Sequence, residues 1–71
     1  MNPLYGEIVL GDVFAEEDGS MWIVVGVKNL GEHVFVTWTW LDDPTFELMH
    51  DFRRCDDRVE ESWPLIMRGF G

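Results

Sequence analysis

The alternation of side chains between residues 33 and 40 is the clearest structural signal in the chain. Apolar side chains alternate there with more polar ones at a period of two, which is typical of a β-strand that buries one face. We expect the core to lie on the face with fewer polar groups, which carries Val34, Val36, Trp38 and Trp40.

Two further strands are predicted ahead of this one. Residues 21–27 are rich in β-branched and aromatic side chains over the length of a strand, which favours a strand over a helix. Gly26 inside this segment indicates a bulge or a sharp bend. Residues 13–15 predict a shorter strand. A turn at 16–20, which contains an Asp-Gly pair, joins it to the strand at 21–27. Residues 29–32 predict a second turn, which leads into the alternating strand.

The second half of the chain is less regular. Residues 41–45 predict a loop, because Pro44 cannot donate a backbone hydrogen bond to a neighbouring strand. Residues 46–49 predict a fourth short strand. Residues 50–54 predict a helical turn with Phe52 directed into the core.

The end of the chain leaves three conformations open. Residues 55–62 carry charges of both signs, and residues 63–67 form a second apolar patch. The C-terminal segment 55–71 is compatible with a fifth strand, with a short helix, or with an arm that docks on another copy of the chain.

Together these elements predict a mainly β fold. Short strands at close spacing, joined by turns with Gly and Asp, are typical of curled sheets and small barrels. A flat sheet of so few strands could not enclose a core. We therefore expect residues 1–71 to form one domain, a small SH3-like, partly open barrel of four to five short antiparallel strands with a short helical turn.

Three stretches of sequence carry a resemblance to a known group of proteins. They are Gly-Asp-Val-Phe at 11–14, Asp-Gly-Ser-Met-Trp-Ile-Val-Val-Gly-Val at 18–27 and Phe-Glu-Leu-Met-His-Asp-Phe-Arg-Arg at 46–54. Over residues 11–54 the chain resembles small SH3-like barrel proteins encoded by bacteriophages and prophages. The resemblance implies a hairpin with a capping turn, and a protein that binds host proteins in the cytoplasm of a bacterial host.

The short length of the chain limits what it can bury. A chain of 71 residues has room for one core, which supplies little net stability at this size. Cys55 is the only cysteine, so no internal disulfide can form, and we expect oligomerisation or a partner to add stability. A lone thiol favours a reducing cytoplasm. No apolar run reaches the roughly 18 residues that span a bilayer, and the N-terminus lacks the pattern of a signal peptide, so we expect no membrane contact.

The negative charge of the chain is unevenly placed. The net charge is -9, with ten acidic residues against Lys28 alone in residues 1–52 and four arginines against four acidic residues in 53–71. Solubility alone needs a net charge of about 2 to 8 in magnitude. Two interpretations stay open: a solubilising surface, or an acidic face that directs the protein onto a basic surface of a partner.

Groups with catalytic or metal-binding chemistry are few. His50 and Asp51 near Cys55 are the residue types of a thiol catalyst, but no nucleophile elbow or oxyanion loop accompanies them. The candidate zinc ligands lack close-paired spacing, and the acidic pair at 42–43 lacks the further oxygen ligands of a calcium loop. We therefore predict no catalytic residue, no metal and no cofactor. The candidate zinc ligands are His33, His50, Cys55, Asp56 and Asp57.

The charge also opposes nucleic-acid binding. Aromatic rings can stack on bases, but affinity depends largely on cations that neutralise phosphates. The only basic cluster, Arg53, Arg54 and Arg58, is interleaved with acidic residues, which favours local salt bridges. We expect no nucleic-acid partner, and a nucleic-acid-binding barrel is the third of three functional hypotheses.

The first hypothesis is a small acidic protein-binding module of phage or prophage origin. It would bind a host protein with a basic surface and modulate or inhibit it, its acidic surface standing in for nucleic-acid phosphates. An aromatic anchor at a strand end among acidic residues is a typical binding hot spot. The predicted contact residues are Trp40, Asp42, Asp43, Glu47 and Asp51.

The second hypothesis is a structural or accessory homo-oligomeric protein, the simplest form of which is a homodimer. The apolar patch near the C-terminus would then pack against another copy of the chain. The predicted self-association residues are Trp63, Leu65, Ile66 and Phe70.

Overall fold

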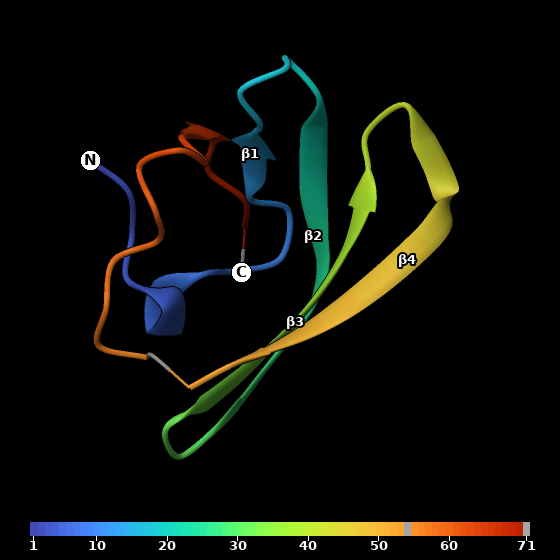
Figure 1. The fold of residues 1–71 in the computed structure, drawn as a ribbon. Helices are drawn as coiled ribbons and strands as arrows, with labels where there is room; N and C mark the ends of the chain where they lie inside the picture. Colours follow the sequence, from blue (N-terminus) through green and yellow to red (C-terminus); the bar gives the residue numbers. More distant parts are fainter. Residues whose placement is uncertain (54, 71) are drawn as a thin grey trace.

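The chain folds into one strongly curled antiparallel sheet of five strands in the order β4-β3-β2-β1-β5 (Figure 1). A computed structural model describes residues 1–53 and 55–70. The elements in chain order are a 3-10 helix η1 at Tyr5–Glu7, β1 at Val13–Ala15, β2 at Met21–Leu30, β3 at His33–Trp40, β4 at Asp43–Phe52 and β5 at Leu65–Met67. The predicted mainly β fold with four to five antiparallel strands is confirmed, although β2 and β4 are longer than expected.

The described residues contain one helical turn, η1. The helical turn predicted at residues 50–54 is wrong. His50 pairs with Val36 and Phe52 pairs with Val34, so these positions continue β4. The pairing of β4 with β3 prevails over any local preference for a turn. Arg54 lies outside the described residues. Phe52 is directed inward as predicted, and its ring stacks on that of Tyr5 at a centroid distance of 4.6 Å.

A bulge interrupts β2 where Gly26 predicted one. Val24 pairs with Trp38 and Gly26 pairs with Thr37, which leaves Val25 as the extra residue of the bulge. A Cβ at position 26 would lie 3.3 Å from the Cβ of Thr37, so the close approach of the strands favours glycine here. The bulge shifts the alternation by one residue, and Val24 and Val27 consequently both pack on the core.

The turn between β2 and β3 is shorter than the predicted turn at 29–32. Strand β2 runs on to Leu30, which pairs with His33, so only Gly31 and Glu32 lie between the strands. Gly31 has a φ of 63°, a left-handed conformation that glycine adopts at little cost.

The β3–β4 connection differs from the predicted loop at 41–45. Strand β4 already begins at Asp43, which pairs with Trp40, while the next pair joins Thr39 and Glu47. The three residues 44–46 between these pairs form a wide irregularity, where Pro44 has no hydrogen bond to donate. The Thr39 hydroxyl lies 3.1 Å from the carbonyl oxygen of Asp43 and also contacts that of Phe46.

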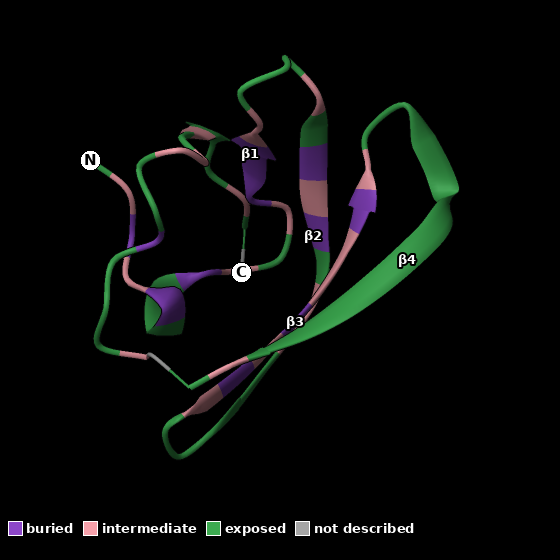
Figure 2. Cartoon of the chain, viewed as in Figure 1, coloured by how far each residue is buried: buried purple, intermediate pink, exposed green. Residues whose placement is uncertain are grey.

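The core lies on the concave face of the sheet, and β4 is almost wholly exposed (Figure 2). Val34 and Val36 are fully buried and Trp38 and Trp40 are half-buried against them, which confirms the predicted core face of β3. Thr39 is the exception on the opposite face, because the irregularity of β4 buries it. The buried hydrophobic cluster comprises Tyr5, Ile8, Phe14, Trp22, Val24, Val34, Val36 and Val59.

The segment after β4 packs on the N-terminal segment of the same chain. Of the three conformations left open for residues 55–71, the structure contains the fifth strand, which pairs with β1. The Tyr5 N–H donates to the Asp57 carbonyl at 2.8 Å, and the Val59 N–H donates to the Pro3 carbonyl at 2.9 Å. The buried carboxylate of Asp12 accepts the N–H of Gly69 at 2.7 Å. These bonds hold both the beginning and the later part of the C-terminal segment against residues 3–12.

Among the described residues, no helix has the length and apolar character needed to cross a bilayer.

Candidate functional site

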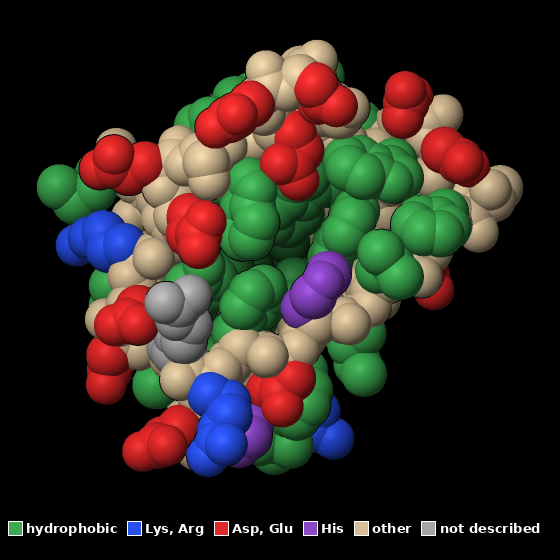
Figure 3. Space-filling view, viewed as in Figure 1, with side chains coloured by type: hydrophobic (Ala, Val, Ile, Leu, Met, Phe, Trp, Pro, Cys, Tyr) green, Lys and Arg blue, Asp and Glu red, His purple; other side chains and the backbone are tan. Residues whose placement is uncertain are grey.

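An aromatic cleft opens on the concave side of the sheet. Its cavity volume is about 230 Å³. Figure 3 shows hydrophobic side chains gathered around a hollow, with acidic side chains along its upper edge and a histidine at its lower right. We call this site the aromatic cleft, and its lining residues are Glu16, Trp22, Val36, Trp38, His50, Phe52 and Trp63.

The four tryptophans of the chain meet at this cleft and its edge. Trp22 lies at the centre, with its ring centroid 5.4 Å from that of Trp38 and 6.3 Å from that of Trp63. Trp40 contacts Trp38 edge to face at 4.9 Å. Trp22 is buried, whereas the other three are half-buried. The cleft and its edge therefore offer three partly exposed indoles around a buried one.

A hydrogen bond between side chains fixes the wall of the cleft on β4. The Nε1–H of Trp38 donates to Nδ1 of His50 at 2.9 Å, and the two rings stack at 5.9 Å. Because Nδ1 accepts this bond, the neutral imidazole carries its proton on Nε2. The second ring nitrogen of His50, an exposed residue, is thus left to donate.

The hairpin between β1 and β2 supplies an acidic edge. Glu16 lines both the aromatic cleft and an adjoining hollow that also contacts Glu17, Asp18, Trp40 and Trp63. The Ser20 N–H donates to a carboxylate oxygen of Asp18 at 2.9 Å, and this bond, followed by that from the Ser20 side chain, lowers the pKa of Asp18. The Asp18 carboxylate therefore keeps its charge to a lower pH than an ordinary aspartate.

The part of the cleft at Trp63 is held by the N-terminal segment. The side-chain amide of Asn2 donates to the Trp63 carbonyl oxygen at 3.0 Å and to the Glu60 carbonyl oxygen at 2.8 Å. Its Oδ1 accepts the Leu65 N–H at 2.9 Å. One side chain near the start of the chain consequently positions Trp63 beside the hairpin.

The structure separates the five residues that sequence analysis grouped around Trp40. Trp40 lies beside the aromatic cleft, and Asp42 and Asp43 lie at the turn that follows it. Glu47 and Asp51 pair with Thr39 and Phe35, which places them on the outer face of the sheet. Asp51 there contacts Nδ1 of His33 at 2.9 Å. These five residues are not one patch.

The four predicted self-association residues are separated as well. Trp63 belongs to the aromatic cleft, and Leu65 packs partly against the core. Ile66 and Phe70 are exposed. Self-association through these positions stays a prediction.

The candidate catalytic pair does not assemble. His50 faces the cleft, whereas Asp51 faces the outer side of β4 and contacts His33, so Asp51 cannot orient the His50 ring. Within residues 1–53 and 55–70, no three His, Cys, Asp or Glu side chains are placed to bind one metal ion. Of the basic cluster, Arg58 donates to the Asn2 carbonyl oxygen at 2.8 Å.

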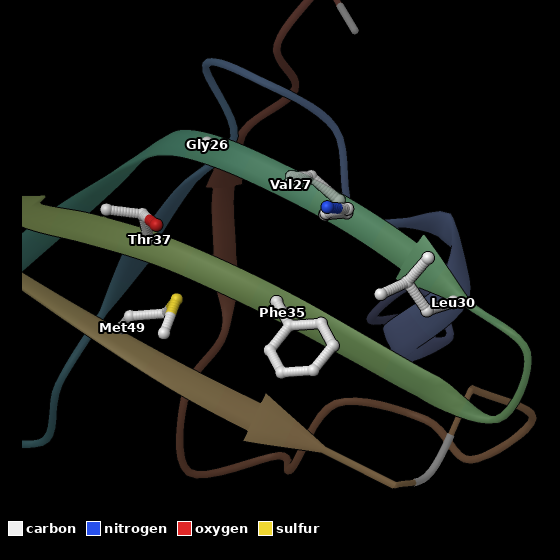
Figure 4. Close-up of a pocket in the computed structure, with 7 residues that line it drawn as sticks. Gly26, Val27, Leu30, Phe35, Thr37 and Met49 are labelled. Carbon is white, nitrogen blue, oxygen red and sulfur yellow. The ribbon is translucent and has the colours of Figure 1, made fainter.

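A second hollow lies on the outer face of the sheet. It has a volume of about 450 Å³, and Leu30, Phe35 and Met49 project into it from three adjacent strands (Figure 4). Lys28 also lines it. This outer hollow is more open and carries one cation, so its chemistry differs from that of the acid-edged cleft.

The sequence pattern does not indicate that Glu16, His50 and Trp63 belong to one site. It predicts only a turn at residues 16–20 and only a self-association surface at Trp63. A usable signal existed for His50, because extending the strand at 46–49 by three residues places His50 on the same face as Leu48. The contact of Trp63 with Trp22 joins distant parts of the chain and has no local signal.

No protein-family model, curated protein or solved structure matches this chain.

Proposed function

We propose that this chain is a protein-binding module that takes an extended basic segment of a partner protein into the aromatic cleft. Apolar side chains of the segment would contact the indoles, and its Lys or Arg side chains would contact the carboxylates of the hairpin. The observation that carries the proposal is the meeting of Trp38 and Trp63 with Glu16 at one open cleft, with Trp40 in the hollow that adjoins it.

The chemistry of the cleft favours a cationic ligand. Indole faces attract Lys and Arg side chains, and partly exposed tryptophans are frequent hot spots of protein interfaces. Of the described residues that line the cleft and its adjoining hollow, none is Lys or Arg. The carboxylates would repel phosphates, which supports a polypeptide partner over a nucleic acid.

The resemblance to phage and prophage proteins gives the proposal a biological setting. In that setting the partner is a host protein with a basic surface in the bacterial cytoplasm, and occupation of that surface inhibits or modulates it. An acidic cleft fits such a role because complementary charge raises the rate of association.

The proposal is tested by titration with two synthetic peptides. One peptide alternates Lys and Val, and the other alternates Glu and Val. We expect the indole N–H signals of Trp38 and Trp63 in the NMR spectrum to shift with the Lys-Val peptide and not with the Glu-Val peptide. No shift with either peptide would overturn the proposal.

A charge variant links the binding to the hairpin. Glu16→Gln combined with Glu17→Gln should weaken binding of the Lys-Val peptide roughly threefold to tenfold, since exposed ion pairs are each worth about 0.2 to 1 kcal/mol. The matched control is Glu32→Gln combined with Asp56→Asn, which removes two exposed charges elsewhere. Equal losses in both double variants would show a nonspecific effect of net charge.

A second candidate function is homo-oligomerisation through the C-terminal segment. Ile66, Met67 and Phe70 are close in sequence and all exposed, and exposed apolar clusters often mark interfaces. Light scattering over a range of protein concentrations tests this candidate. Ile66→Ser combined with Phe70→Ser should abolish any dimer that forms through this surface.

A further inference from the structure

We propose that the partner segment binds as an added β-strand along the free edge of β4 and extends the curled sheet across the aromatic cleft. This inference rests on the proposed function and names how the segment is bound. It commits to one occupant, an extended stretch of a partner protein in which basic and apolar side chains alternate.

Strand β4 has an edge that can accept another strand. It lies at the end of the sheet, and among the described residues only β3 pairs with it. The irregularity at 44–46 disturbs its first part, but the pairs from Glu47 to Phe52 follow one another without a shift. Alternate backbone N–H and C=O groups in this regular part therefore point away from the sheet.

The regular part of β4 has only part of the usual protection of an edge strand. Proteins commonly protect such edges with charged side chains, Pro or a bulge; residues 47–52 carry Glu47 and Asp51 but neither Lys nor Pro. Leu48 is 41% exposed and Met49 is 64% exposed. An unpaired edge with exposed apolar side chains can accept an added strand.

The aromatic cleft lies directly beside this edge. His50 and Phe52 belong to β4 and line the cleft together with Trp63 from the C-terminal segment. In an added strand, side chains on the same face as His50 would lie over the cleft, because alternation continues from strand to strand. Apolar side chains at those positions would contact the indoles.

The outer face of the same edge selects basic residues. Glu47 and Asp51 project from that face, and cross-strand pairs of opposite charge stabilise a sheet. Lys or Arg at every second position of the added strand would lie beside these carboxylates. The edge thus requires an alternation of basic and apolar side chains.

The same charges oppose a second copy of this chain as the occupant. In an antiparallel pairing of two β4 strands about Met49, Glu47 of each copy would lie opposite Asp51 of the other. Like charges directly opposed are destabilising. A basic segment of another protein avoids this repulsion.

The test compares three peptides that alternate Lys and Val. The first is unmodified, the second has two N-methyl groups on adjacent central residues, and the third has two N-methyl groups at its ends. Adjacent central methyl groups block both edges of a strand without changing its charge or side chains. We expect the central pair to weaken binding roughly tenfold through the lost backbone hydrogen bonds, and the terminal pair to change binding less than threefold.

The readouts separate this inference from the proposed function. Strand addition should protect alternate amides of residues 47–51 from hydrogen exchange, in addition to shifting the indole signals. If all three peptides shift the indole signals equally and no β4 amide gains protection, strand addition is wrong and the cleft still binds. If no peptide shifts them, both proposals fail. Protection of β4 that rises with protein concentration in the absence of peptide would identify a second copy as the occupant and overturn the inference.

A charge variant tests the outer face. Glu47→Gln combined with Asp51→Asn should weaken binding of the unmodified peptide roughly threefold to tenfold. The matched control is again Glu32→Gln combined with Asp56→Asn. Equal affinities for the two double variants would show that the outer carboxylates do not select the added strand.

Discussion

At the scale of single residues, one short side chain joins the two ends of the chain. Asn2 bonds to backbone groups at Val59, Glu60, Trp63 and Leu65. These partners span the segment that places Trp63 beside the cleft. Sequence alone could not show this role, because the partners lie more than fifty residues away and an Asn near a terminus has no distinctive pattern.

Asn2→Ala should lower the free energy of unfolding by about 2 kcal/mol, because backbone groups that are partly buried lose their hydrogen-bond partner. Asn2→Asp should be at least as costly, since a carboxylate of the same size accepts bonds but cannot donate to carbonyl oxygens. Urea denaturation measures both. The matched control is Asn29→Ala at an exposed position of β2. If Asn29→Ala lowered the free energy of unfolding as much as Asn2→Ala, a specific role for Asn2 would be contradicted.

At the scale of elements, the predictability of each strand follows from how local its signal is. Strand β3 was predicted with its correct bounds because residues 33–40 alternate along their whole length. Strand β4 was predicted too short because Pro44 and the charged residues near 50–54 suggested a loop and a turn. Pairing with β3 overrides both suggestions, and the irregularity that admits Pro44 depends on a contact of Thr39 with another strand.

The same distinction governs the candidate site. Trp40 was singled out from sequence as an anchor, and it does lie beside the cleft. The acidic residues grouped with it follow it in the chain, but the structure places Glu47 and Asp51 on the other face of the sheet. The carboxylates that do line the cleft and its edge come from the hairpin at 16–20, which joins β1 to the strand that carries Trp22.

Thr39→Val tests the contact that holds the start of β4. Thr39 is 4% exposed, and loss of its hydroxyl would leave the carbonyl oxygens of Asp43 and Phe46 without this donor. We expect the free energy of unfolding to fall by about 1 to 2 kcal/mol and the amides of residues 43–46 to exchange faster. Thr39→Ser keeps the hydroxyl and should preserve slow exchange in this segment, whereas equally fast exchange in both variants would assign the effect to packing.

At the scale of the whole molecule, the open sheet and the charge distribution act together. The sheet ends at β4 and β5 without joining them, so aromatic side chains that a closed barrel would cover remain partly exposed. The net negative charge is concentrated in the part of the chain that forms the first four strands, because the four arginines all follow it. The cost of this arrangement is repulsion among carboxylates in a small domain, which weakens the folded state.

Screening of that repulsion should stabilise the protein. Between about 20 mM and about 300 mM NaCl the Debye length falls several-fold. We therefore expect the melting temperature in the absence of any ligand to rise by roughly 3 to 5 °C. A gain of less than about 1 kcal/mol in the free energy of unfolding would produce a rise of this size in a domain of this length. A triple variant that neutralises exposed acids, Glu17→Gln with Glu32→Gln and Asp42→Asn, should melt higher than the parent at low salt and gain less from added salt. Calorimetry of both proteins measures these melting temperatures. A melting temperature that falls with added salt would mean that attractive ion pairs outweigh repulsion across the molecule. The proposal of a self-repelling acidic surface that attracts a basic partner would then lose its physical basis.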